Sequence, residues 1–193
     1  PFTLNQAVAD FIIIDQQPNA ITVLAAAVKK EYIDEHLNLF AQAGLQPDVI
    51  TVDLFDLYGL YKRIPAYAQL KKTVALIDIE VASTRIAYIV NGKLSALRTL
   101  PKGTSQWVKD LSQHLSISTQ QAHEKLVRFG LDAHNDEAYT KAIHASLKDF
   151  LQEIQFTLQS FAQRSAMPIT TDELLLLGSG SELAGITHFI QDV

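Results

Sequence analysis

Residues 73–100 contain three strand-like segments in close succession, and this pattern sets the class of fold. The segments are TVALIDI (73–79), STRIAYIV (83–90) and KLSALRTL (93–100). Asn91-Gly92 separates the last two, and this dipeptide is the strongest short signal for a hairpin because both turn positions need a positive φ. We therefore expect an antiparallel three-stranded meander within an α/β chain.

Helical patterns follow the meander. Residues 103–115 predict one helix and residues 118–130 a second, with Ser118 and Gln121 at capping-box spacing and Gly130 at the end. Residues 135–165 predict a helix of about 30 residues whose single apolar face we interpret as core. ELLLLGSGSELAGI (173–186) then predicts a fully buried strand, a small-residue turn and a helix.

The first part of the sequence has a different organisation. Strand-like segments at 9–14 and 20–28 flank a turn cluster, a helix follows at 29–44, and PDVITVDL (47–54) predicts a short buried strand. This order indicates a small α+β unit over residues 8–53. Asp53 then begins a helix as its N-cap, with Asp56 where an acid favours the helix dipole. Two acids at this spacing are also compatible with a metal site.

Composition excludes several classes of function. The net charge is −5, with basic residues scattered, which argues against a nucleic-acid surface. The sequence has no Cys, its six His lack metal-ligand spacing, and no nucleophile and base can be paired, so an autonomous hydrolase is not supported. No apolar run approaches the roughly 18–20 residues of a membrane span. Because the sequence begins with Pro and ends inside a predicted helix, we expect it to be a piece of a longer protein.

Two segments could together hold a nucleotide. A hairpin with Asp78 at its entry and Ser83 and Thr84 beyond it can bind phosphate through backbone N–H groups, while the Asp holds Mg²⁺ through water. A strand that ends in Gly178-Ser179-Gly180 before a helix lets an adenosine approach the backbone. Tight turns explain each signal equally well.

The order of these elements resembles the second half of the actin-like (ribonuclease-H-like) ATPase fold. In detail it is similar to the PilM family of type IV pilus assembly proteins, which are related to the cell-division protein FtsA. VALIDIEVASTRIAYIVNGKLSALRTLPKG stands at the family's second phosphate hairpin, and LLLLGSGSELAGITHFI resembles its adenosine motif. Residues from PFTLNQAVADFIII to the helix that begins at Asp53 resemble the family's small inserted domain.

The resemblance implies a set of nucleotide-binding residues, with Asp78 also holding Mg²⁺ through water: Asp78, Ser83, Thr84, Gly103, Gly178, Ser179, Gly180 and Ser181. ATP and Mg²⁺ would then be cofactors of the full-length protein, not of this piece, because the family's first phosphate hairpin would precede residue 1. The resemblance also implies a PilN-like inner-membrane partner whose cytoplasmic tail docks near residues 8–53, and further partners among other pilus or secretion components. It implies a cytoplasmic location at that membrane and the option of homo-oligomers.

Three departures from the family pattern weaken the nucleotide site. Glu80 replaces the Gly of Asp-Ile-Gly, where its side chain would take the space of a phosphate and its carboxylate would repel the phosphate charge. In the helix that resembles the nucleotide-contacting Ala-Glu…Lys stretch, the positions read Ala122, His123 and Leu126, so the acid and the base are both missing. Ser179 stands where the adenosine motif usually has a second Gly.

We therefore expect an actin-like α/β fragment with a small α+β insert at residues 1–53, a helix and linker at 54–72, and a second lobe at 73–193. The expected function is a cytoplasmic pilus-assembly scaffold with a degenerate nucleotide site and no catalytic residues. Three alternatives remain open from the sequence: a slow ATPase of the same family, the cytoplasmic domain of the type II secretion protein GspL, and an FtsA-like cell-division protein.

Overall fold

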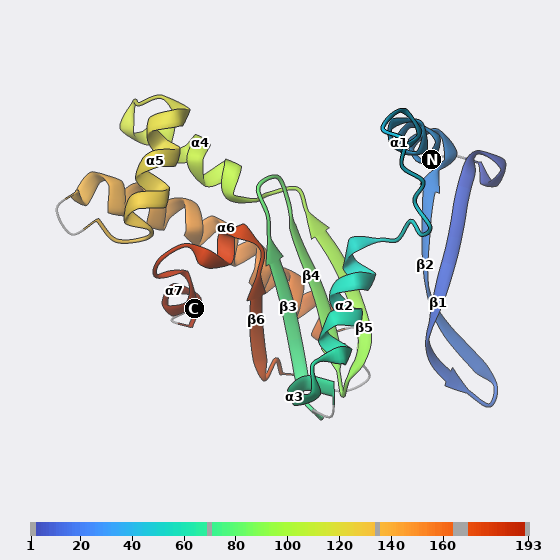
Figure 1. The fold of residues 1–193 in the computed structure, drawn as a ribbon. Coiled ribbons are helices and arrows are strands. Elements are labelled where there is room, and N and C mark those ends of the chain that lie inside the picture. Colours follow the sequence, from blue (N-terminus) through green and yellow to red (C-terminus); the bar gives the residue numbers. More distant parts are fainter. Residues whose placement is uncertain (1–2, 69–70, 134–135, 164–169, 192–193) are drawn as a thin grey trace. The chain divides into compact units, whose positions relative to one another are not determined.

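The structure is a computed structural model that describes residues 3–68, 71–133, 136–163 and 170–191 (Figure 1). The chain divides into two compact units, residues 1–60 and 61–193, which are described separately. The three-part division expected from the sequence, with boundaries at residues 53 and 72, stays a prediction.

A two-stranded ribbon and one long helix form most of the first unit. After a short 3-10 helix (Leu4–Gln6), strand β1 (Ala7–Gln17) pairs antiparallel with β2 (Ala20–Lys29), with a bulge between Ile13 and Asp15. Helix α1 (Lys30–Gln42) follows at once. Gly44 adopts φ +72°, the left-handed conformation that a glycine after a helix end allows, as the sequence predicted.

The short strand expected at residues 47–54 is wrong. The segment from Leu45 to Val52 forms neither helix nor strand, and Val49 is 77% exposed. Its apolar, β-branched residues suit a strand, but a strand also needs a neighbour that completes its hydrogen bonds. In the described part of the first unit the sheet contains β1 and β2 alone.

The second unit is built on a four-stranded sheet of order β5-β4-β3-β6. Strands β3 (Thr73–Ile79), β4 (Thr84–Val90) and β5 (Lys93–Leu100) form the predicted antiparallel meander. Asn91 and Gly92 have φ of 51° and 76°, as the hairpin turn between β4 and β5 requires. Strand β6 (Glu173–Leu177) joins the other side of β3 in parallel.

The helices before, between and after these strands follow the order expected from the sequence. Helix α2 (Asp53–Arg63) crosses the boundary between the units, and α3 (Pro65–Ala68) follows it. Along the chain, three helices lie between β5 and β6: α4 (Thr104–Leu115), α5 (Thr119–Phe129) and α6 (Glu137–Gln163). After β6 come a 3-10 turn, η2 (Ser179–Glu182), and helix α7 (Ile186–Gln191). The predicted capping box of Ser118 and Gln121 is present. Within the described residues, no helix is long and apolar enough to cross a membrane.

The core of the second unit lies between the sheet and the long helix α6, which runs across one face of the sheet (Figure 1). Alternate residues of β3 and β4, such as Ile77 and Tyr88, point into this layer. Trp107 of α4 meets Phe150 of α6 edge to face at 5.2 Å between ring centroids, which anchors α4 on α6. The apolar face predicted for the long helix is therefore confirmed as core.

Strand β6 is less buried than the sequence suggested. The run ELLLL was expected to be fully buried, yet Leu174 is 39% exposed and the other four residues of the strand are partly buried. Position explains the difference, because β6 lies at an edge of the sheet whereas β3, with every residue buried, lies inside it.

Candidate functional site

The residues predicted to bind nucleotide come together at the carboxyl ends of β3 and β6. These two strands are parallel neighbours, with Asp78 in register with Leu177, so the turns that follow them open at the same edge of the sheet. Ligands of open α/β sheets bind at this edge. The β3–β4 turn brings Ser83 and Thr84 there, and the start of α4 brings Gly103.

The first backbone donors of α4 are bonded to the β3–β4 turn. The N–H of Thr104 donates to the carbonyl of Glu80 at 3.0 Å, and that of Ser105 to the carbonyl of Val81 at 2.9 Å. A methyl group on Gly103 would lie 2.0 Å from the Glu80 oxygen, so a glycine is needed for this close approach. N–H groups that could bind an anion at a helix start therefore already have partners within the protein.

Most of the predicted phosphate-binding hydroxyls also donate inside the protein. Thr84 Oγ1 donates to the carbonyl of Lys102 at 2.8 Å, and Ser181 Oγ to the carbonyl of Gly178 at 2.7 Å. Ser179 Oγ donates to the Glu80 carboxylate at 3.5 Å. The bonds of Thr84 and Ser179 join neighbouring turns, and the bond of Ser181 closes the turn after β6 on itself.

The two glycines of the GSG motif are required by packing. Gly178 adopts φ 77° and ψ 175°, a conformation open to glycine almost alone. A methyl group there would lie 2.5 Å from the carbonyl oxygen of Ile79 and 2.6 Å from Asp78 Oδ1. On Gly180 it would lie 2.4 Å from Ile79 Cγ2. The turn after β6 thus touches the end of β3 directly, and the motif has a structural reason independent of adenosine.

Arg85 is the residue of this site that the sequence analysis missed. It lies opposite Asp78 in the β3–β4 register, and its Nη2 is 2.7 Å from Asp78 Oδ2 and 3.9 Å from Glu80 Oε1. The Asp78 side chain is 7% exposed, that of Arg85 19% and that of Glu80 40%. The pairing would have followed from the sequence if residues 80–83 had been interpreted as a four-residue loop, because such a loop places residues 78 and 85 opposite each other.

The donor set does not fit the Mg²⁺ ion that the resemblance implies. Mg²⁺ needs oxygen ligands in octahedral order and keeps several waters. Asp78 Oδ2 is paired with Arg85, and Oδ1 packs against Gly178 in a nearly buried position. No cluster of three acidic or histidine side chains able to hold a metal occurs among the described residues.

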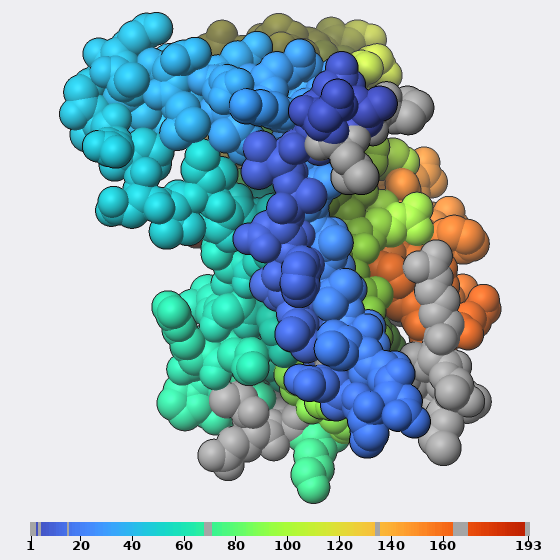
Figure 2. Space-filling model, turned by 90° about the vertical axis from the view of Figure 1, so that its right-hand side faces the viewer, coloured from blue at the N-terminus to red at the C-terminus, as the bar shows by residue number. Residues whose placement is uncertain are grey.

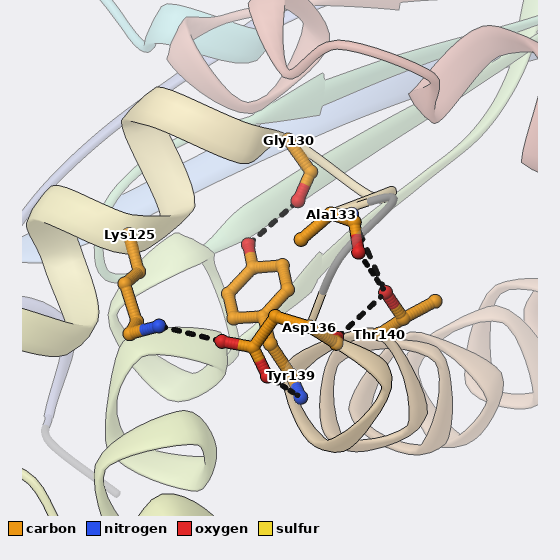
Figure 3. Close-up of polar contacts among 6 residues, drawn as sticks. All are labelled: Lys125, Gly130, Ala133, Asp136, Tyr139 and Thr140. Atoms are coloured by element: carbon orange, nitrogen blue, oxygen red, sulfur yellow. Dashed lines mark hydrogen bonds and ion pairs between the residues drawn. The ribbon is translucent and has the colours of Figure 1, made fainter.

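A polar network joins α5 and the loop after it to the start of α6 (Figure 3). Lys125 donates to Asp136 at 2.7 Å, and Tyr139 donates its hydroxyl to the carbonyl of Gly130 at 2.6 Å. Lys125 lowers the pKa of Asp136, and burial raises the pKa of Tyr139 to about 12. The N–H of Leu131, the residue after Gly130, donates to the carbonyl of Ala184, which links this network to the segment that follows η2.

The helix positions that depart from the family pattern have mixed environments. Ala122 and Leu126 of α5 are buried in the core, and His123 is exposed. Leu126 therefore has a packing role at the position where the family pattern has a base.

Comparison with solved structures shows the class of fold. A chain of a PilM–PilN type IV pilus biogenesis complex matches with a TM-score of 0.78 and 22% identity, over 98% of this chain and 55% of that one. MreB5 of Spiroplasma citri bound to ADP matches with a TM-score of 0.64 and 16% identity, over 86% of this chain and 59% of its own. The chain thus has the actin-like ATPase fold.

Sequence comparison places the chain within that class. The cell division protein FtsA of Bacillus subtilis is 28% identical over 138 residues, which are 62% of this chain and 31% of FtsA. The family of the type IV pilus assembly protein PilM matches residues 1–193, and the chain belongs to this family. It spans about a third of the length of FtsA and about half that of the matched PilM chain.

Proposed function

We propose that this chain is part of a cytoplasmic scaffold of a type IV pilus assembly machine, in which an actin-like fold carries a degenerate nucleotide site. In this role it docks the cytoplasmic tail of an inner-membrane partner similar to PilN, which holds it at that membrane. The chain belongs to the PilM family. The observation that carries the proposal is that Glu80 and Arg85 lie together at the hairpin where the family pattern has a phosphate.

Charge and space at the hairpin disfavour a nucleotide. Asp78, Glu80 and Arg85 sum to one negative charge at the hairpin where the family resemblance implies a phosphate. Two like charges at ~4 Å repel by about 1 kcal/mol in water and about 4 kcal/mol at an intermediate dielectric. The upper value corresponds to roughly a thousandfold loss of affinity. The matched MreB5 structure is bound to ADP, so a protein of this fold can accept a nucleotide.

The ribbon of the first unit offers an apolar surface for the partner tail. Four large apolar side chains lie on one face of the β1–β2 ribbon, and all are exposed: Phe11, Ile13, Ile21 and Val23. Figure 2 looks onto this ribbon, drawn in blue. Contiguous apolar side chains on a soluble protein commonly mark a site of interaction. The matched PilM structure was solved in complex with PilN, which supports a tail of that kind as the partner.

Thermal unfolding of the full-length protein with and without excess Mg-ATP tests the degenerate site. A ligand at 100 times its Kd adds about 2.7 kcal/mol to stability, which is several degrees for a domain of this size. We expect no shift. A clear upward shift, together with ATP turnover, would replace the scaffold by the slow ATPase.

Binding of a fluorescently labelled partner tail, followed by anisotropy, tests the docking. Phe11 and Ile13 are 58% and 55% exposed, so replacing both with Ser should leave the fold intact and weaken binding at least about tenfold. Phe156→Ser, at a 64% exposed site on α6, is the matched control and should bind as the wild type does. Equal affinity of all three proteins would exclude this surface as the docking site.

A further inference from the structure

The contact between Asp78 and Arg85 is built into the pairing of β3 and β4. The two residues are direct cross-strand partners, and the next pair, Ile79 and Thr84, is also in register. Opposite charges at facing positions of an antiparallel pair lie on the same face of the sheet. A movement of the 80–83 loop alone therefore leaves the backbones of Arg85 and Asp78 opposite each other, because both residues belong to paired strands.

The Asp78 carboxylate is enclosed on both of its oxygens. Oδ2 is 2.7 Å from Arg85 Nη2, and the Asp78 side chain is 7% exposed. Oδ1 faces Gly178, since a methyl group built on that glycine would lie 2.6 Å away. A buried carboxylate needs a positive partner, and here the guanidinium supplies it. An incoming cation would have to displace that guanidinium and bring its own water into a closed space.

The same guanidinium also faces Glu80, the residue that departs from the family pattern. Arg85 Nη2 is 3.9 Å from the Glu80 carboxylate, whose other oxygen accepts a bond from Ser179 in the turn after β6. One positive group thus lies between two carboxylates, one from β3 and one from the turn that follows it. Guanidinium is suited to this because it is always charged and donates from several N–H groups in a fixed plane.

We propose that the side chain of Arg85 replaces the divalent cation at this site, so that the hairpin is held in place without metal. The inference concerns the same site as the proposed function and deepens its degenerate character, but it can fail or hold separately. It predicts that the wild-type site is indifferent to Mg²⁺ and Mn²⁺, and that removing the guanidinium creates a cation site from Asp78 and Glu80.

The test uses the full-length protein without nucleotide. Thermal unfolding and Mn²⁺ paramagnetic resonance are measured with MgCl₂ or MnCl₂ for the wild type, Arg85→Ala, and the double variant Arg85→Ala with Asp78→Asn. At 100 times the Kd, bound cation should raise the melting temperature of Arg85→Ala by a few degrees, because binding to the folded state stabilises it. The double variant should lose this shift. Arg98→Ala, at an exposed position on β5, is the matched control and should respond as the wild type does.

Two results would overturn the inference. One is Mn²⁺ binding by the wild type that Asp78→Asn abolishes, since the site would then hold metal beside Arg85. The other is a folded Arg85→Ala that gains no cation response. If Arg85→Ala does not fold, Arg85→Gln keeps much of the side-chain volume and carries the same test, and the wild-type comparison with Asp78→Asn stands by itself.

The outcome for nucleotide is separate. A wild type that binds ATP equally well with Mg²⁺ and with a chelator would overturn the degenerate site of the proposed function and support the replacement of the metal by Arg85. A wild type that binds neither nucleotide nor metal, beside a cation response in Arg85→Ala, supports both.

Discussion

Alanine at Gly178 should destabilise the ligand-free protein strongly, because the turn after β6 is packed onto the end of β3. Gly178 has a backbone conformation of φ 77° and ψ 175°, which costs any other residue about 1–3 kcal/mol. The added methyl group would also lie 2.5 Å from the Ile79 carbonyl oxygen. Overpacking of this kind costs about 1–3 kcal/mol. We expect a total loss of about 2–6 kcal/mol in the free energy of unfolding.

Gly180→Ala separates the cost of overpacking from the cost of backbone strain. Its methyl group would lie 2.4 Å from Ile79 Cγ2, but Gly180 has no positive φ, so the packing cost of about 1–3 kcal/mol acts alone. Gly59→Ala is the opposing control. Gly59 lies within α2 with nothing within 4 Å of the added methyl group, so the change should raise stability by about 0.5–1 kcal/mol.

Urea unfolding followed by fluorescence is the assay. The chain has a single Trp, at position 107, and it is 1% exposed in the core of the second unit. If Gly178→Ala and Gly180→Ala both unfolded at the wild-type urea concentration without ligand, packing would not explain these glycines. Their role would then have to be the approach of a nucleotide, against the degenerate site proposed above.

Three further changes test the network beside this turn and the cap of α5. Lys125 keeps the pKa of Asp136 below its ordinary 3.8, so the charged Asp136 stabilises the fold above that pH. At pH 7, Asp136→Asn should unfold at a lower urea concentration than the wild type. The difference between their unfolding midpoints should shrink toward pH 3. Folding raises the pKa of Tyr139 from 10.0 to about 12, so the stability that its neutral hydroxyl gives below pH 10 should fall between pH 10 and 12. Tyr139→Phe should remove this fall and cost about 1 kcal/mol of unfolding free energy at pH 7. If stability depended on pH in the same way in the variant and the wild type, Tyr139 would not be its cause. Ser118→Ala removes the side-chain cap of α5 and should cost about 1 kcal/mol in urea unfolding, whereas an unchanged midpoint would show that the cap adds nothing.

The sequence by itself determined those features whose signals lie within a few neighbouring residues. The Asn91-Gly92 turn, the capping box of α5 and the apolar face of α6 each follow from local spacing, and the structure shows all three. The order of these elements was also sufficient for the family resemblance, which the PilM match over residues 1–193 confirms. Local conformational preference and hydrophobic period act on the same chain segment, so they can be read without knowing the fold.

The tertiary structure decided everything that depends on which segments meet. Residues 47–54 have a strand-like pattern but no neighbour to pair with in the described first unit. Strand β6 is only partly buried because it lies at an edge of the sheet. Asp78 was visible as an acid at the end of a strand, but its partner Arg85 comes from the register of β3 with β4. The same register places a guanidinium beside the carboxylate for which the family resemblance had implied Mg²⁺. The chemistry of a carboxylate is set by the charges that folding brings beside it.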